Sequence, residues 1–143
     1  MASVKRIPEG YHSATPFLSV ADARKLIDFA TRAFGGVETR YHDLGNGHVH
    51  AEFRIGDSMF MVGQTEAAPA AIYLYVDDVD TVYARAVAAG AKSVEAPIDK
   101  PYGDRGAWVI DQCGITWFIA SHIEDVSDHE IAQRMTAQTT ARK

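Results

Sequence analysis

The chain has 143 residues, of which 47% are hydrophobic and 23% are charged, and its net charge is −5. This length and composition fit one globular domain with a core of its own and exclude a disordered chain. The acidic balance, without a cluster of lysine and arginine, argues against a nucleic-acid partner. No apolar run reaches the roughly 18–20 residues of a membrane-spanning helix, so we expect no membrane contact and a cytoplasmic location. The single cysteine, Cys113, excludes an internal disulfide and a cysteine-rich zinc site.

The first predicted elements are a strand over residues 17–20 and a helix over 23–34. Asp22 between them is a residue type that caps helix N-termini, and a pair of glycines ends the helix. The apolar residues of the helical segment have the spacing of one buried stripe: Ala23, Leu26, Ile27 and Ala30. Residues 48–62 follow as two strands joined by a turn.

The same order of elements returns 56 residues further along the chain. A strand over 73–76 is followed by the cap residue Asp78, a helix over 79–89 and two strands over 106–120. The second helix repeats the apolar stripe of the first: Val79, Val82, Tyr83 and Ala86. Agreement of the strands, caps, stripes and hairpins predicts two copies of one βαβββ unit.

We therefore predict an α+β fold and a single domain over residues 1–143. Its parts in chain order are an N-terminal arm over 1–13, a first unit over 14–64, a second unit over 71–126, and a C-terminal helix and tail over 127–143. Ser127 and Glu130 form a capping box, which predicts where the last helix begins.

Several short motifs accompany the repeat: Gly-Tyr-His at 10–12, His-Ala-Glu-Phe-Arg-Ile-Gly-Asp-Ser at 50–58, Gly-Asp-Arg-Gly at 103–106, Asp-Gln-Cys-Gly at 111–114 and His-Ile-Glu-Asp-Val-Ser at 122–127. Together with the tandem repeat, they resemble the vicinal oxygen chelate superfamily, and within it the glyoxalase/bleomycin-resistance-like proteins. The resemblance implies a curled eight-stranded mixed sheet, with the helices on its convex side and a ligand cleft on its concave side. It also implies a homodimer, because this cleft is often shared between two copies.

Enzymes of this superfamily hold one divalent metal ion, and the resemblance places its ligand positions at Thr15, Phe60, Ala71 and Phe118. A catalytic metal site needs roughly three ligands from histidine and carboxylate side chains, which these positions do not supply. We therefore expect no metal and no other cofactor. An open alternative is a new metal site on one strand face, formed by His48, His50 and Glu52. The remaining histidines, His122 among them, are expected to be structural or exposed to solvent.

Strand alternation assigns residues to the concave face. In the strand that begins at His48, alternate residues form an apolar set that should pack on the helices, so His50 and Glu52 face the cleft. The family's ligand positions give the same inward orientation to aromatic residues on the neighbouring strands. We expect eight residues to bind the ligand: His50, Glu52, Phe60, Tyr73, Tyr75, Trp108, Phe118 and Arg105. Arg105 lies at the rim, where it either binds an anionic group or pairs with Asp104.

A cleft lined by aromatic side chains suits a planar or apolar small molecule. Our first hypothesis is a metal-independent protein that binds and sequesters such a molecule, as bleomycin-resistance proteins do with their antibiotic. The second is a lyase or isomerase in which His50 and Glu52 are catalytic, by proton transfer or by binding a metal. The third and weaker hypothesis is a structural or regulatory dimer without a ligand. Enzymatic and non-enzymatic hypotheses both stay open at this point.

Overall fold

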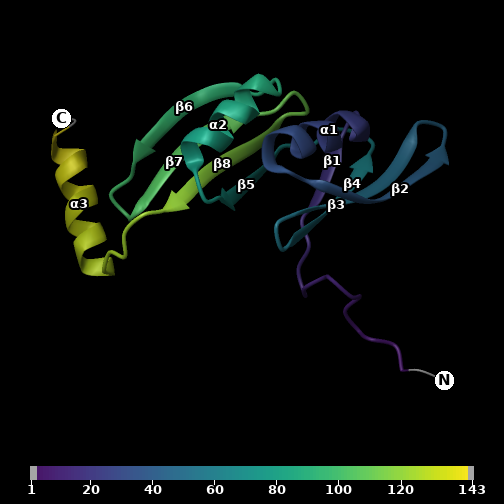
Figure 1. The fold of residues 1–143 in the computed structure, drawn as a ribbon, viewed down its shortest axis with the longest axis horizontal. Coiled ribbons are helices and arrows are strands. Elements are labelled where there is room, and N and C mark those ends of the chain that lie inside the picture. The colour runs from purple at the N-terminus through teal and green to yellow at the C-terminus, as the bar shows by residue number, and fades with distance from the viewer. Residues whose placement is uncertain (1–2, 142–143) are drawn as a thin grey trace.

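The computed structural model describes residues 3–141 and contains, in these residues, eight strands and three helices (Figure 1). The elements in chain order are β1 Phe17–Val20, α1 Ala23–Phe34, β2 Val37–Gly45, β3 His48–Ile55, β4 Ser58–Gln64, β5 Ala70–Tyr75, α2 Val79–Ala88, β6 Lys92–Asp99, β7 Asp104–Ile110, β8 Ile115–His122 and α3 Asp128–Ala141. Residues 1–2 and 142–143, at the two ends of the predicted arm and tail, lie outside the described residues.

The two predicted βαβββ units are present and have the same topology. The strand order is β1-β4-β3-β2 in the first unit and β5-β8-β7-β6 in the second. In each unit the first strand pairs in parallel with the last, and the other neighbours are antiparallel. The α+β fold is therefore confirmed, with the eight strands divided into two hydrogen-bonded sheets of four.

Both helices begin where the sequence predicts, because an aspartate caps each of them. The Asp22 side chain accepts a hydrogen bond from the backbone N–H of Lys25 at 3.1 Å, and Asp78 accepts one from Thr81 at 3.3 Å. The helix α1 ends at Gly35, whose φ of 68° is the left-handed conformation that glycine adopts without steric cost.

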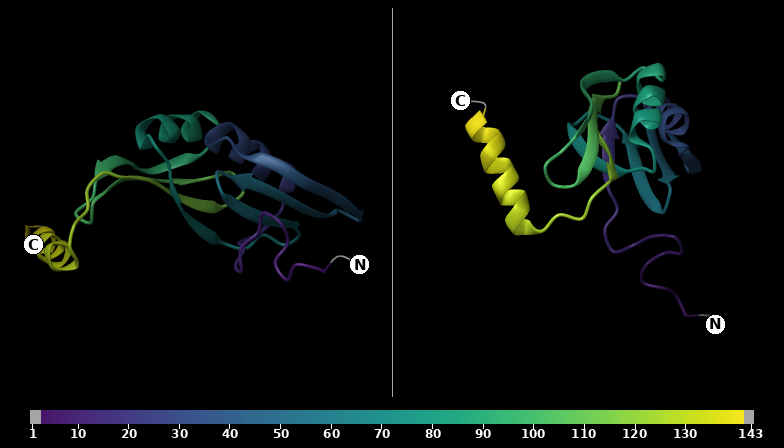
Figure 2. Two further views of the ribbon diagram at one scale, coloured as in Figure 1. Left: turned by 60° about the horizontal axis from the view of Figure 1, so that its bottom comes forward. Right: turned by 60° about the vertical axis from the view of Figure 1, so that its left-hand side comes forward.

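The helices α1 and α2 lie next to each other on the outer side of the arched sheets (Figures 1 and 2). Their inward faces and the facing strand residues form one hydrophobic core that continues across the junction between the units. The fully buried Trp117 of β8 occupies this junction, with its ring centroid 4.7 Å from that of Phe34 on α1 and 6.0 Å from that of Phe60 on β4. We infer that the two units stabilise each other through this aromatic packing.

A buried carboxylate holds the turn between β7 and β8. Asp111, only 5% exposed, accepts hydrogen bonds from the backbone N–H groups of Cys113 at 2.7 Å and Ile115 at 3.1 Å. Its other oxygen accepts one from Nε1 of Trp117 at 2.8 Å. Burial nevertheless raises the pKa of Asp111, because it outweighs these hydrogen bonds. The turn thus fixes the indole that joins the two units.

This turn also changes how the strands of the two units align with each other. The corrected alignment changes the predicted position of Phe60. Phe17 lies opposite Met61 in the first unit, whereas Tyr73 lies opposite Phe118 in the second. Met61, and not Phe60, is therefore the counterpart of Phe118. Asp111 and Ile115 close the second hairpin with three residues between them, whereas Ile55 and Ser58 close the first with two. The prediction that Phe60 faces the cleft is wrong: its ring stacks on that of Phe53 in the core, with centroids 5.0 Å apart.

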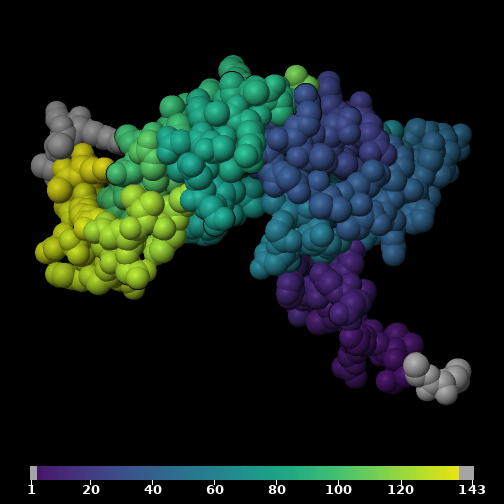
Figure 3. Space-filling model, in the orientation of Figure 1, coloured from purple at the N-terminus to yellow at the C-terminus, as the bar shows by residue number. Residues whose placement is uncertain are grey.

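The two ends of the described chain project from the body of the molecule (Figures 1 and 3). No residue of the arm over 3–16 is buried, and none is buried in α3 as far as its side chains are described, residues 128–138. The helix α3 starts as predicted, with the Ser127 hydroxyl accepting the backbone N–H of Glu130 at 3.2 Å, and Arg134 pairs with Glu124 at 2.8 Å. Among the described residues, no helix has the length and apolarity needed to cross a membrane.

Candidate functional site

The candidate site lies on the sheet faces turned away from α1 and α2, which we call the concave face. Figure 3 shows this side of the molecule open between the N-terminal arm and α3. A hollow of about 220 Å³ lies at the junction of the units, bordered by the residues before β1, the start of β4, and β5. Its walls include Thr15, Met59 and Tyr73. Phe60 also borders the hollow, but its side chain is buried in the core.

Four aromatic side chains form a continuous row on the concave face of the second unit. The aromatic row consists of Tyr75, Tyr73, Phe118 and Trp108, with successive ring centroids 5.3, 6.0 and 5.2 Å apart. The exposed fractions are 60% for Tyr75, 45% for Tyr73 and 36% for Trp108. Large aromatic rings exposed side by side in this way are costly in water and are typical of a binding surface.

Beside the aromatic row is a small pocket of about 100 Å³, roughly the size of one ring. Tyr73, Tyr102, Trp108 and Phe118 contribute to its walls, and Lys100 contributes the one cationic side chain. The Lys100 ammonium pairs with Glu95 at the edge of the same pocket. The pocket therefore offers aromatic contact on several sides, and Glu95 neutralises the charge of its one cationic side chain.

The aromatic row ends at a buried carboxylate, Asp104 on β7, which is only 2% exposed. Its Oδ2 accepts hydrogen bonds from the hydroxyls of Tyr73 at 2.7 Å and Tyr75 at 2.9 Å, and its Oδ1 lies 3.0 Å from Nδ1 of His122. Burial acts to raise the pKa of Asp104, but the bonds from Tyr73, His122 and Tyr75 outweigh it, so this pKa lies below its ordinary value. The pKa of both tyrosines is raised, by burial first for Tyr73 and by the Asp104 bond first for Tyr75.

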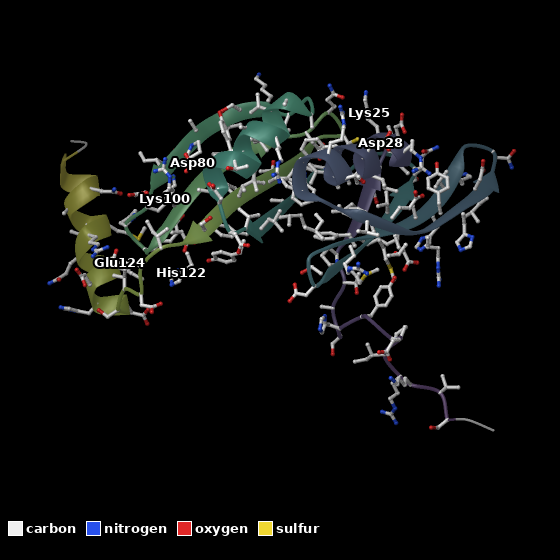
Figure 4. All side chains as sticks on the ribbon, viewed as in Figure 1. Lys25, Asp28, Asp80, Lys100, His122 and Glu124 are labelled. Atoms are coloured by element: carbon white, nitrogen blue, oxygen red, sulfur yellow. The ribbon has the colours of Figure 1, made fainter. Side chains whose placement is uncertain are left out.

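His122 is held between two carboxylates at the end of β8. While Nδ1 contacts Asp104, Nε2 lies 2.8 Å from Oδ1 of Asp125, and these contacts raise the pKa of His122. Figure 4 shows His122 below the second sheet, near the start of the segment that leads through Glu124 to α3. The four side chains Asp104, Tyr73, Tyr75 and His122 are referred to below as the Asp104 cluster.

A second polar group lies on the concave face of the first unit. Nε2 of His50 lies 2.8 Å from Oε2 of Glu52, which is 3% exposed, and a guanidinium nitrogen of Arg40 lies 3.7 Å from the same oxygen. Burial raises the pKa of Glu52, as expected for a carboxyl group removed from water. The ring of Phe17 lies 6.2 Å from that of His50. His50 and Glu52 are therefore paired as the acid–base hypothesis requires.

Arg105 does not lie where the sequence prediction placed it. It points toward the helix side, where its guanidinium pairs with Asp80 at the start of α2 at 2.9 Å and with Asp99 at 3.0 Å. The expected pairing with Asp104 is wrong, because neighbouring residues of a strand point to opposite faces and Asp104 faces the cleft. Two carboxylates thus hold Arg105 away from the concave face.

The structure divides the predicted site residues between the two units. Tyr73, Tyr75, Phe118 and Trp108 come together in the second, and His50 and Glu52 form a pair in the first. Asp104 and His122 were not predicted as site residues. Alternation along β7 and β8 would have found them, because they share the strand face of Trp108 and Phe118 and lie opposite each other.

Comparison with known proteins agrees with this architecture. Residues 12–119 match the family model of the Glyoxalase/Bleomycin resistance protein/Dioxygenase superfamily, and the chain belongs to this superfamily. The uncharacterized protein Mb0911c of Mycobacterium bovis is 32% identical over 140 residues, which cover 87% of this chain and 92% of that protein. The uncharacterized protein Rv0887c of Mycobacterium tuberculosis is also 32% identical, with 82% of its length covered.

Solved structures show the same fold. TioX from Micromonospora sp. ML1 is 26% identical and superposes with a TM-score of 0.66, covering 78% of this chain and 100% of that chain. A glyoxalase-related enzyme from Fulvimarina pelagi superposes with a TM-score of 0.62 at 20% identity, covering 77% and 87% of the two chains. Similarity at this second level concerns the fold alone.

The family's metal ion does not fit the residues of this chain. With the corrected alignment, the positions implied by the resemblance are Thr15, Met61, Ala71 and Phe118. These side chains offer one hydroxyl and one thioether, whereas a catalytic divalent ion takes imidazole and carboxylate ligands. Among the described residues, no group of three or more His, Cys, Asp and Glu side chains is arranged to hold a metal ion, which also disfavours the alternative of His48, His50 and Glu52.

Proposed function

We propose that this protein binds a small planar aromatic molecule on the concave face of its second unit, without a metal ion, and sequesters it. The observation that carries the proposal is the aromatic row, in which exposed rings lie side by side and end at the Asp104 cluster. A planar ligand stacked on this row would bury apolar area on both partners. The polar end of the row would fix its orientation.

Rigidity of the row supports binding further. Asp104 holds the hydroxyls of Tyr73 and Tyr75 at 2.7 and 2.9 Å, so both rings are positioned before a ligand arrives. A preorganised surface loses less conformational entropy on binding than a mobile one. The geometry therefore favours a binding surface over a passive patch of exposed side chains.

The proposal is tested by replacing Trp108 with alanine and measuring affinity for aromatic antibiotics and aromatic metabolites. We expect at least one compound to quench intrinsic tryptophan fluorescence at micromolar concentration, because Trp108 is 36% exposed while Trp117 is fully buried. Trp108→Ala should weaken that binding by roughly 2–4 kcal/mol, measured by calorimetry. Phe17→Ala is the matched control, since Phe17 is 54% exposed but lies in the first unit.

Two outcomes would contradict the proposal. Equal losses in Trp108→Ala and Phe17→Ala would place the binding surface elsewhere. Absence of any aromatic ligand would favour the third hypothesis, a structural or regulatory dimer with no ligand.

A second candidate function rests on the His50–Glu52 pair. A carboxyl group with a raised pKa, 2.8 Å from an imidazole, has the composition of a general acid–base pair and favours a lyase or isomerase. In that case Glu52→Gln should lower turnover about 10²- to 10⁴-fold with a modest change in substrate binding, as expected when a proton carrier is removed. Under the binding proposal, Glu52→Gln leaves ligand affinity unchanged.

We further propose that two copies associate into a homodimer. The arm over 3–16 and α3 project from the body, and none of their described side chains is buried. Exposed Ile7, which is 42% accessible, and the face of α3 would be covered by a second copy. We also propose a cytoplasmic location, which fractionation of cells that express the protein would test.

A further inference from the structure

We infer that the molecule bound by the aromatic row carries a carboxylate, and that this carboxylate binds Nε2–H of His122 in place of Asp125. The inference rests on the proposed function and deepens it, because it assigns the ligand a charge and an orientation. It concerns the Asp104 cluster, where the aromatic row ends.

The first step concerns the hydrogen atoms of the cluster. Tyr73 and Tyr75 both donate their hydroxyl hydrogens to Oδ2 of Asp104, so toward a ligand they are left only as acceptors. A neutral imidazole has one N–H, whereas His122 contacts a carboxylate oxygen with each nitrogen, at 3.0 Å and 2.8 Å. Both nitrogens therefore carry hydrogen and the ring is cationic. Nε2–H is the donor that the cluster presents outward.

The second step compares the two carboxylates on His122. Asp104 is 2% exposed and is fixed by three hydrogen bonds, so it forms a permanent part of the fold. The side chain of Asp125 is fully exposed, at 103%, and belongs to residues 123–127, which have no regular secondary structure. Asp125 is thus an exposed carboxylate already seated on an imidazolium, and a ligand carboxylate can take its place with the same charge and geometry.

The third step concerns space and charge around His122. An open hollow of about 400 Å³ borders His122 together with Tyr75, Asp77 and Ser121, so a ligand group can reach Nε2. The carboxylates that contact the imidazole or line this hollow with it are Asp77, Asp104 and Asp125, and the tyrosines that share Asp104 are neutral donors. Because this surrounding is acidic, a second anion beside Asp125 would be repelled, and a carboxylate gains only by displacing it. Removing Asp125 should therefore strengthen binding.

The fourth step sets the length of the ligand. On the concave face the pair Asp104–His122 lies four residues along the strands from the pair Trp108–Phe118. This separation is roughly 13 Å at about 3.3 Å per residue. A biphenyl carboxylate has approximately this span, so its rings would stack along the aromatic row while its carboxylate contacts His122.

The experiment compares three probes of one shape: biphenyl-4-carboxylate, biphenyl-4-methanol and biphenyl-4-methylamine. Dissociation constants are measured from tryptophan fluorescence near pH 6, and the His122 ring signals are followed by NMR, assigned with His122→Ala. We expect the carboxylate to bind about 10-fold more tightly than the alcohol. His122→Ala should abolish that preference, and Asp125→Ala should raise carboxylate affinity about 3- to 10-fold. His129→Ala, an exposed histidine on α3, is the control.

The outcomes separate this inference from the proposed function. Quenching of Trp108 by carboxylate and alcohol alike, with no change in the His122 ring signals, overturns the inference and supports the aromatic surface. Tighter binding of the amine also overturns it, because an amine would use Asp77 and Asp125. A His122 shift with the carboxylate but no Trp108 quenching supports the carboxylate site and contradicts the proposed function. Absence of both responses overturns both.

Discussion

Asp104 is the residue that most clearly separates the observed site from the predicted one. A carboxylate only 2% exposed would normally be neutralised by protonation, yet here two phenol hydroxyls and an imidazolium keep it ionised. The position therefore combines a structural role, which is to fix Tyr73 and Tyr75, with an electrostatic one, which is to hold the charge on His122.

The Asp104 cluster should give stability a distinct dependence on pH. The folded-state pKa of Asp104 is lowered, so its contribution is present above the unfolded value of about 3.9 and is lost as the pH falls through the folded value. The pKa of His122 is raised, so its contribution is complete below about 6.5 and is lost as the pH rises through the folded value. We expect Asp104→Asn to cost about 2–3 kcal/mol of unfolding free energy between pH 4 and 6.5, and less outside this range.

Urea denaturation at a series of pH values checks this prediction. Asp57→Asn is a suitable control, because Asp57 is an exposed residue of the turn between β3 and β4. A constant difference between Asp104→Asn and the wild type from pH 3 to pH 8 would show that the cluster does not titrate as described.

Ionised Glu52 should lower the stability of the fold, whereas ionised Asp104 raises it. Its folded-state pKa is raised by burial, so the folded protein favours the protonated form and loses stability as the pH rises through the folded value. Glu52→Gln keeps the shape and removes the charge. We expect the variant to gain stability relative to the wild type as the pH is raised from 4 to 8, in thermal unfolding monitored by circular dichroism. A loss that grows with pH would mean that the bond to His50 outweighs burial.

At the scale of single elements, the strand β4 tests the corrected alignment of the repeat. Phe60 is 2% exposed and stacks on Phe53, whereas Met61 is only partly buried and lies opposite Phe17 on the concave face. Phe60→Ala should therefore lower the unfolding free energy by about 3–5 kcal/mol, and Met61→Ala by distinctly less, about 1 kcal/mol. Chemical denaturation of the two variants measures this contrast. The reverse ranking would restore the sequence-based orientation of Phe60.

Much of the element structure could be predicted from sequence because its causes are local. Asp22 and Asp78 cap helices through contacts within one turn, and the apolar stripes report which helix faces are buried. The orientation of Phe60 was predicted wrongly because it was transferred from Phe118 through the repeat. The hairpin at Asp111 is closed by one residue more than the hairpin before β4, and a shift of one residue reverses the face of an aligned side chain.

The candidate site also contains residues that could be predicted from local pattern and residues that could not. Alternation along each strand, combined with the repeat and with the ligand positions that the resemblance implies, was enough to place Tyr73, Trp108 and Phe118 on one face. The hydrogen bonds of Asp104 were not predictable in this way, because its partners come from β5 and β8, which are brought beside β7 only by the sheet order β5-β8-β7-β6.

For the whole molecule, the helix α3 gives a test of the proposed homodimer. Ile131 is an apolar residue of α3 that is only partly covered in the single copy. Ile131→Arg should weaken self-association about 10-fold or more, as measured by analytical ultracentrifugation, while the melting temperature extrapolated to low concentration stays the same. Gln133→Arg, at an exposed position of α3, is the control. A monomer at micromolar concentration in the wild type would contradict the proposal.

The division into two sheets also bears on how copies of the chain can exchange parts. Among the described residues no strand of one unit pairs with a strand of the other, and residues 65–69 alone connect the sheets along the chain. Two molecules can therefore trade a whole unit without breaking a strand-to-strand hydrogen bond. What must separate and form again is the core at the junction, where Phe34 and Phe60 pack on Trp117. If copies exchange units in this way, the populations of exchanged and unexchanged forms would depend on protein concentration. Their interconversion would be as slow as opening that core, so a sample that is concentrated and then diluted would return only slowly to its starting populations.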